Sequence, residues 1–204
     1  MQQGIIVNRK KWIAGFITVG FVSFAFAVEN ISFKKKEKSI DQIANELISE
    51  ISDQVKKKYN LQLVASGGGG VYGLDLLTLD FTGYSEYFIS EMREVLIDIS
   101  LQFLDIINAS KEFEKRLACF PFSGDNINVM VGFIREDYTR PKKPFIALAF
   151  TVDGKIYYRF DGNEKKPFED AGEETFEEAL AIVANSQNLE LSKRTKEYLL
   201  SHAK

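Results

Sequence analysis

The chain has 204 residues, of which 45% are hydrophobic and 27% charged, and its formal net charge is -3. This composition is that of a globular protein, and it excludes a disordered chain and a membrane protein with many spans. The single cysteine excludes an internal disulfide, and one Cys with one His cannot supply the roughly four ligands of a structural zinc site. The slightly acidic charge disfavours a nucleic-acid partner, because such proteins present a basic face.

The N-terminal residues predict an export signal. Arg9, Lys10 and Lys11 precede an uncharged apolar run, residues 12–27, which ends in an Ala-x-Ala motif. This order is typical of a cleavable signal peptide, so we predict that residues 1–27 are removed, with Ala25 and Ala27 as the cleavage-site residues. The alternative is an uncleaved anchor in the inner membrane, although the run is short for a span of about 20 apolar residues.

Residues 28–38 are predicted to be a basic linker, and residues 39–204 a single domain. Ser39 opens a capping box with Gln42, and apolar residues at helical spacing predict a helix over residues 39–59. Two strands are predicted over residues 61–65 and 74–82, on either side of four glycines. Ser85 is the expected N-cap of a second helix that ends near residue 108, and a short helix is expected over residues 110–118.

The second half of the domain predicts three strands followed by two helices. The strands span residues 127–134, 145–152 and 155–160, and Asp153-Gly154 is a strong hairpin signal between the last two. Residues 161–172 are predicted to form a polar loop. Thr175 opens a second capping box, at the start of a helix that ends near residue 186, and a last helix spans residues 192–203. Clustered strands separated by helices predict an α+β fold, with a mostly antiparallel sheet of about five strands and helices packed on one face.

The stretch VASGGGGVYG, residues 64–73, matches G-x-G-x-x-G by letter. A dinucleotide site needs a helix after the glycines and a P-loop needs Gly-Lys-Ser/Thr, but residues 74–81 predict a strand. Two interpretations remain: a hairpin loop or bulge that joins two antiparallel strands, or bare backbone N–H groups that bind a small anion and let a partner approach closely. The candidate binding residues are Ser66, Gly67, Gly68, Gly69, Gly70, Tyr72 and Tyr84.

The sequence offers no catalytic residue and predicts no cofactor and no metal. The single histidine, His202, lies close to the C-terminus, where chains tend to be poorly ordered. Acidic residues beside glycines or at helix starts are explained by turns and helix dipoles. An enzyme would need Asp75, Asp80 or Tyr84 in a pocket shared with the glycines, which would then form an anion site.

Several segments taken together resemble a known group of proteins: VASGGGGVYGLDLLTLDFTGY, LDIINASKEFEKRLACFPFSGDNINVMVGFI, VDGKIYY and ETFEEALAIV. The group comprises small exported proteins of uncharacterised function from chlamydia-like intracellular bacteria. The matching features are Ser-Gly-Gly at residues 66–68, Phe-Pro-Phe at residues 120–122 and Glu-Glu-Ala-Leu at residues 177–180. The resemblance covers about residues 61–185, and it implies an exported bacterial protein without implying a reaction.

We therefore predict an exported protein, periplasmic or secreted, whose domain binds a partner protein, a peptide or an envelope component. The alternatives are a membrane-tethered module held by residues 12–27 and an enzyme based on carboxylates or tyrosine, with the glycines as its anion site. Membrane contact is predicted only if residues 12–27 are not cleaved off, and only through them, and nucleic acid is not an expected partner.

Overall fold

A computed structural model of the chain describes residues 38–70, 74–117 and 119–202. The predicted signal peptide with Ala25 and Ala27, nearly all of the linker and Tyr72 lie outside these residues. The described residues belong to one compact unit that begins at Lys38. Among the helices they form, none is long and apolar enough to cross a membrane.

In the described chain, helices and strands come in groups of one to four consecutive elements. In order, the elements are α1 (Ile40–Tyr59), β1 (Gln62–Gly69), β2 (Leu76–Gly83), α2 (Ile89–Ala109), α3 (Lys111–Glu114), the 3-10 turn η1 (Gly124–Asn126), β3 (Ile127–Phe133), β4 (Leu148–Val152), β5 (Lys155–Asp161), β6 (Phe168–Thr175), α4 (Phe176–Val183) and α5 (Leu189–His202).

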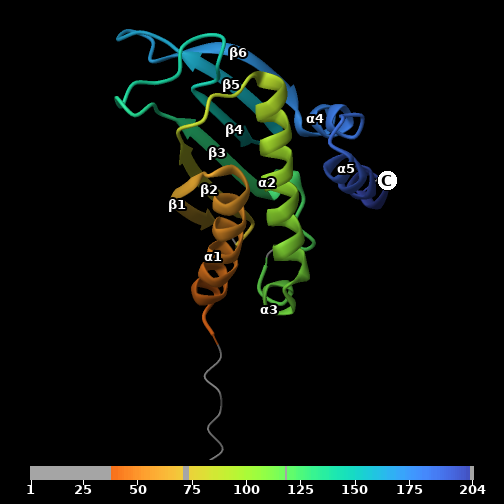
Figure 1. Ribbon diagram of the computed structural model, residues 1–204. Helices are drawn as coiled ribbons and strands as arrows, with labels where there is room; N and C mark the ends of the chain where they lie inside the picture. Colours follow the sequence, from red (N-terminus) through yellow and green to blue (C-terminus); the bar gives the residue numbers. More distant parts are fainter. Residues whose placement is uncertain (1–37, 71–73, 118, 203–204) are drawn as a thin grey trace, which may run out of the picture. The chain divides into compact units, whose positions relative to one another are not determined.

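The six strands form one mixed sheet, in which they lie in sequence order from β1 at one edge to β6 at the other (Figure 1). Neighbouring strands are antiparallel except β2 and β3, which are parallel and are joined through α2 and α3. The α+β prediction is confirmed, but within the described residues the sheet has six strands rather than about five. The predicted polar loop over residues 161–172 is wrong at its end, because β6 begins at Phe168 and pairs with β5.

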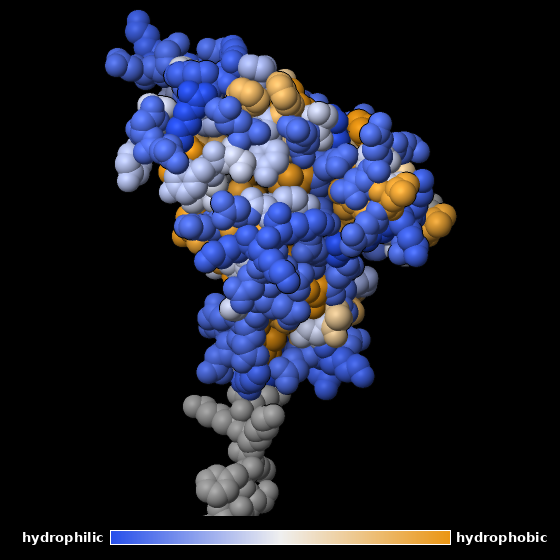
Figure 2. All heavy atoms as spheres, viewed as in Figure 1, coloured by the Kyte–Doolittle hydropathy of each residue, from blue (hydrophilic) through white to orange (hydrophobic). Residues whose placement is uncertain are grey.

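The two faces of the sheet differ in burial. Along β2, Leu77, Leu79 and Phe81 are buried, while the residues between them are only half-buried. The buried face packs against α2, and α1 and α2 lie in front of it (Figure 1). The outward side of α1 is hydrophilic (Figure 2), as expected for an amphipathic helix that buries one stripe. The other face of the sheet carries half-buried side chains, among them Leu76, Thr78, Asp80, Met130, Phe150 and Tyr157.

Local sequence signals fix several element ends as predicted. The capping boxes at Ser39 and Thr175 are both present, and α1 ends at Asn60, which has a left-handed φ of 55°. The Asp153-Gly154 turn has positive φ at both residues, as a tight hairpin requires. The prediction of Ser85 as the cap of α2 is wrong. The helix starts three residues later, where the Phe88 N–H donates to Glu91 Oε2 at 2.9 Å.

The glycine run is a strand rather than a loop. Gly67, Gly68 and Gly69 belong to β1 and pair with residues 76–78 of β2, so the hairpin-loop interpretation is wrong for these three. Backbone amides pair across a sheet without any help from side chains, and β2 supplies the complementary edge. An irregularity between Leu63 and Ala65 is the bulge of this strand.

Candidate functional site

The glycine run lies on an exposed edge of the sheet. Ser66 and the glycines after it, through Gly70, are all exposed, and in the described part of the chain β1 pairs with β2 alone. The Gly69 carbonyl accepts a hydrogen bond from the Asp75 N–H at 3.0 Å, so its backbone groups face the β2 side. Because backbone groups alternate along an antiparallel strand, those of Ser66 and Gly68 face the outer edge.

Neighbouring atoms require a glycine at only one of the three strand positions. A Cβ at Gly68 would lie 2.6 Å from Leu74 Cδ1 and 2.9 Å from Leu77 Cδ2, closer than side chains pack. At Gly67 and Gly69 a Cβ would meet nothing within 4 Å, and neither residue has a positive φ. The fold therefore explains the missing side chain at Gly68 and leaves those at Gly67 and Gly69 unexplained.

The two edge strands of the sheet differ in charge. Residues 61–70, which include β1, carry no charged side chain, whereas β6 carries Glu169, Asp170, Glu173 and Glu174. Charged side chains on an edge strand prevent it from pairing with a strand of another molecule. By this criterion β6 is protected against such pairing and β1 is not.

A pocket of about 170 Å³ lies between the N-terminal half of α1 and β1. Ser66, Gly67 and Gly68 line it from the strand, and Asp41 and Asn45 from the helix. Its apolar walls come from Ile40, Ala44, Ile48, Leu74 and Leu77. The three apolar residues of α1 are spaced four apart, which places them in one row along the helix. Because β1 is an edge strand, this pocket lies at the margin of the sheet; we call residues 66–69 and 40–48 together the β1–α1 margin.

Tyr84 does not join the glycines. β2 starts opposite them at Leu76 and ends at Gly83, so Tyr84 lies roughly 25 Å further along the sheet. The pocket at the β1–α1 margin is lined by neither Asp75 nor Asp80 nor Tyr84. The shared pocket that an enzyme would need from these residues is therefore not formed by the described residues.

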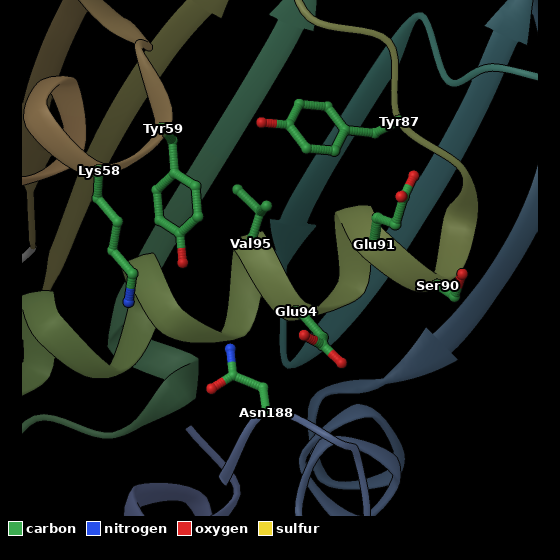
Figure 3. A pocket seen from close by; sticks show the side chains of 8 residues that line it. All are labelled: Lys58, Tyr59, Tyr87, Ser90, Glu91, Glu94, Val95 and Asn188. Carbon is green, nitrogen blue, oxygen red and sulfur yellow. The ribbon is translucent and has the colours of Figure 1, made fainter. Parts of the chain in front are cut away.

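A second pocket, of about 350 Å³, lies between the end of α1, the first half of α2 and Asn188 (Figure 3). In Figure 3, Tyr59 and Tyr87 stand on either side of Val95, and Glu94 and Asn188 lie lower in the view. Glu91, which also lines this pocket, is engaged as the acceptor for the N-terminal N–H of α2. None of these residues was predicted from the sequence as part of a site.

A buried carboxylate adjoins this second pocket. Asp98 of α2 is 2% exposed, and four side chains donate hydrogen bonds to it. The donors are Tyr59 Oη at 2.7 Å, Lys58 Nζ at 2.9 Å, Arg194 Nη1 at 3.3 Å and Gln102 Nε2. Burial, followed by the hydrogen bond to Asp98, raises the pKa of the Tyr59 hydroxyl. The cluster joins α1, α2 and α5, and its donors fully explain the buried charge as a structural feature.

The Asp98 cluster was missed by sequence reasoning although one signal for it exists. Asp98 is the one charged residue among the apolar side chains of residues 95–104. A carboxylate within a buried helical stripe must be paired or neutralised, so this position predicts nearby donors. Gln102, four positions later on the same helix, could have been named from this spacing. The sequence could not name Lys58 and Arg194, because they lie 40 positions earlier and 96 positions later.

A third cavity, of about 640 Å³, lies between η1, α4 and α5. It contains the chain's single histidine, His202, whose ring stacks on Tyr198 with centroids 4.1 Å apart. His202 is exposed and is the last residue of α5.

Across residues 38–70, 74–117 and 119–202, no three His, Cys, Asp or Glu side chains are placed so that they could hold a metal ion. Comparison with protein-family models, with curated proteins and with solved structures found no match to this chain. Within the described residues, the β1–α1 margin is where candidate binding residues predicted from the sequence line a pocket.

Proposed function

We propose that the chain is an exported, non-enzymatic domain, periplasmic or secreted, that binds a partner protein or envelope component through its β1–α1 margin. The observation that carries the proposal is an uncharged edge strand whose Gly67 and Gly69 are required neither by packing nor by backbone conformation. Glycine within a strand costs about 0.5–1 kcal/mol relative to alanine. A partner that approaches closely would account for two residues that the fold alone does not need.

Export is supported by the basic, apolar and Ala-x-Ala segments that end at Ala27, and by the resemblance to exported proteins of chlamydia-like bacteria. The expected mature chain begins at Val28. N-terminal sequencing of the protein recovered from outside the cytoplasm tests this directly. Recovery of the intact N-terminus in the membrane fraction would instead support a module tethered through residues 12–27.

A binding role is favoured over catalysis by the composition of the β1–α1 margin. Five of the ten residues that line its pocket are apolar, and its side-chain polar groups belong to Asp41, Asn45 and Ser66. General acid–base chemistry needs a donor and an acceptor poised at one reacting group, and a nucleophile needs an adjacent base. A pocket with apolar side chains on its walls, beside an open strand edge, is instead suited to holding a polypeptide.

The binding function is tested by affinity capture from the envelope and external fractions. The tested variant is Gly67→Val with Gly69→Val, which adds side chains where no neighbour lies within 4 Å. The matched control is Glu173→Val, which places the same side chain on the opposite edge at a 60% exposed position. We expect the native chain and the control to retain a common partner that the glycine variant loses, while all three show the same circular dichroism.

Two outcomes would contradict the proposal. If both variants keep every partner of the native chain, the β1–α1 margin is not the binding surface. If the native chain captures nothing beyond what the glycine variant captures, the domain does not bind through this surface.

A further inference from the structure

We infer that the β1–α1 margin takes up an uncharged, extended peptide segment as an added strand, with an apolar side chain in the α1–β1 pocket and an aromatic side chain over Gly67 or Gly69. The inference rests on the proposed binding function and specifies its geometry and the chemistry of the partner. Three features of the margin support it independently: its backbone, its pocket and its bare outer face.

The backbone of β1 offers the hydrogen-bonding groups. The N–H and C=O groups of Ser66 and Gly68 face the outer edge, where the described chain places no strand. An added strand would pair with these groups whatever its sequence, because main-chain bonds supply the affinity in this mode of recognition. The lack of charge in residues 61–70 leaves the edge open to a segment that is itself uncharged.

The pocket would select the side chains of the partner that point toward α1. Side chains of a strand alternate between the two faces of the sheet, so every second residue of the partner would point toward α1. There the pocket of about 170 Å³ offers a wall built from Ala44 and Ile48 of α1 and Leu77 of β2. Figure 1 shows α1 lying beside β1, and residues of both elements line this pocket. An aliphatic or aromatic side chain matches these walls better than a charged one.

The outer face of β1, which lacks side chains at Gly67 and Gly69, would select the side chains of the partner that point away from α1. Strands lie about 4.8 Å apart, so a long side chain of the partner can reach across β1 only where β1 has no side chain of its own. Gly67 and Gly69 leave such a passage toward Thr78 and Leu76, their partners on β2. Aromatic side chains on an adjacent strand cover glycines in this way. Since β1 contains no aromatic residue, a second copy of this strand would not supply one, and a foreign segment is the better occupant.

The test starts from a random nonapeptide library displayed on phage and selected on the exported protein. We expect enriched sequences with few charges, apolar residues at every second position and at least one aromatic residue. Synthetic peptides of these sequences should bind with a Kd that Ser66→Pro raises by about tenfold or more, because proline removes the outward N–H. Ser66→Ala, which keeps this N–H and removes only the hydroxyl, should raise the Kd far less than Ser66→Pro.

A second pair of variants examines the pocket. Ala44→Phe fills it from α1, and we expect the peptide Kd to rise by about tenfold or more. Ser49→Phe adds the same side chain at an exposed α1 position outside the pocket and should have no effect. Equal melting temperatures for all four variants would show that the losses are not caused by unfolding.

Several results would overturn strand addition. These are a charged consensus, a consensus with helical spacing, no enrichment at all, or a Kd unaffected by Ser66→Pro and Ala44→Phe. A dimer in light scattering that Ser66→Pro dissociates would show that a second copy occupies the edge instead. If Ser66→Pro and Ala44→Phe both keep a captured partner that the glycine variant loses, the binding function stands and this geometry is wrong. If the native chain captures no such partner, the binding function fails as well.

Discussion

Asp98 shows how strongly one buried charge can depend on its neighbours. Its side chain is 2% exposed, and its donors Lys58 and Arg194 are 45% and 31% exposed. Removal of the carboxylate by Asp98→Ala leaves Tyr59 Oη and Gln102 Nε2 without their acceptor, while the two cations can turn toward water. We expect a loss of about 2–4 kcal/mol in the free energy of unfolding, measured by urea denaturation.

Asp105→Ala provides the control for this loss. Asp105 accepts from the same Arg194, but its side chain is 61% exposed. An exposed ion pair contributes about 0–1 kcal/mol. If Asp98→Ala and Asp105→Ala cost the same, the buried cluster would not be a major source of stability.

The glycines of β1 allow a second prediction at the scale of single residues. Gly68→Ala forces a Cβ against Leu74 and Leu77, and we expect a loss of about 1–3 kcal/mol in thermal or urea unfolding. Gly67→Ala and Gly69→Ala enter open space in an extended backbone and should stabilise the fold by about 0.4–1 kcal/mol. A loss of stability at Gly67 or Gly69 would show that the fold needs these glycines and would remove the main support for the binding proposal.

Asp80 gives a pH-dependent prediction. It lies half-buried on the outer face of β2, and burial raises the pKa of its carboxyl. An acid with a raised pKa in the folded state binds its proton more tightly there, so stability is lost as pH rises from the ordinary pKa through the raised one. Asp80→Asn should therefore increase the free energy of unfolding at pH 7 and have little effect well below the ordinary pKa.

Asp161 should behave in the opposite way. A hydrogen bond from Lys142 Nζ, at 2.7 Å, lowers the pKa of this carboxyl. Its contribution is present above the ordinary pKa and is lost as pH falls through the lowered one. Asp161→Asn should thus decrease stability at pH 7 and not at low pH. Changes of the same sign for Asp80→Asn and Asp161→Asn would contradict this account of both groups.

At the scale of elements, local signals predicted helix α1, helix α4 and the β4–β5 hairpin well. Each has a local sequence signal at one of its ends or in its turn: a capping box at Ser39, another at Thr175, and Asp153-Gly154 in the tight turn. β6 was missed because its four carboxylates and Gly172 disfavour a strand locally. Other parts of the chain stabilise β6, because Arg159, Lys143 and Arg93 form ion pairs with its acidic residues.

The link between α2 and β6 can be tested at Glu174. Arg93 Nε donates to both carboxylate oxygens, at 2.7 and 3.0 Å, and Tyr158 Oη donates to Oε1 at 2.5 Å. Burial, together with Glu174, raises the pKa of the Tyr158 hydroxyl. Glu174→Ala leaves a buried hydroxyl and an 18% exposed guanidinium without their acceptor, so we expect a loss of about 2–4 kcal/mol in chemical denaturation.

Its neighbour Glu173 serves as the comparison. Glu173 is 60% exposed and lies 4.0 Å from Lys155 Nζ, so Glu173→Ala should change stability by less than about 0.5 kcal/mol. If the two substitutions had equal effects, the attachment of β6 to α2 would depend on backbone pairing rather than on this ion pair.

At the scale of the whole molecule, sequence patterns gave the fold class but not the pairing of strands. Alternation along residues 76–82 and 127–133 shows that each strand buries one face, yet it does not show that β2 and β3 are parallel. That pairing depends on where α2 and α3 return the chain, which is a long-range property. The candidate site was also predicted only in part. The sequence singled out the glycines, but their position on an open edge beside an α1 pocket follows only from the assembled sheet.

The assembled sheet also predicts how the mature chain should behave. The buried core described by the structure begins at Ile43 in α1 and ends at Leu191 in α5, within the unit that starts at Lys38. A chain that begins at Val28, as signal cleavage would leave it, retains all of these residues. We expect it to unfold cooperatively, with a melting temperature that changes by less than about 2 °C when residues 28–37 are also removed. A drop of several degrees on this second truncation would show that the linker contributes to the folded domain, and residues 28–38 would then no longer count as a linker.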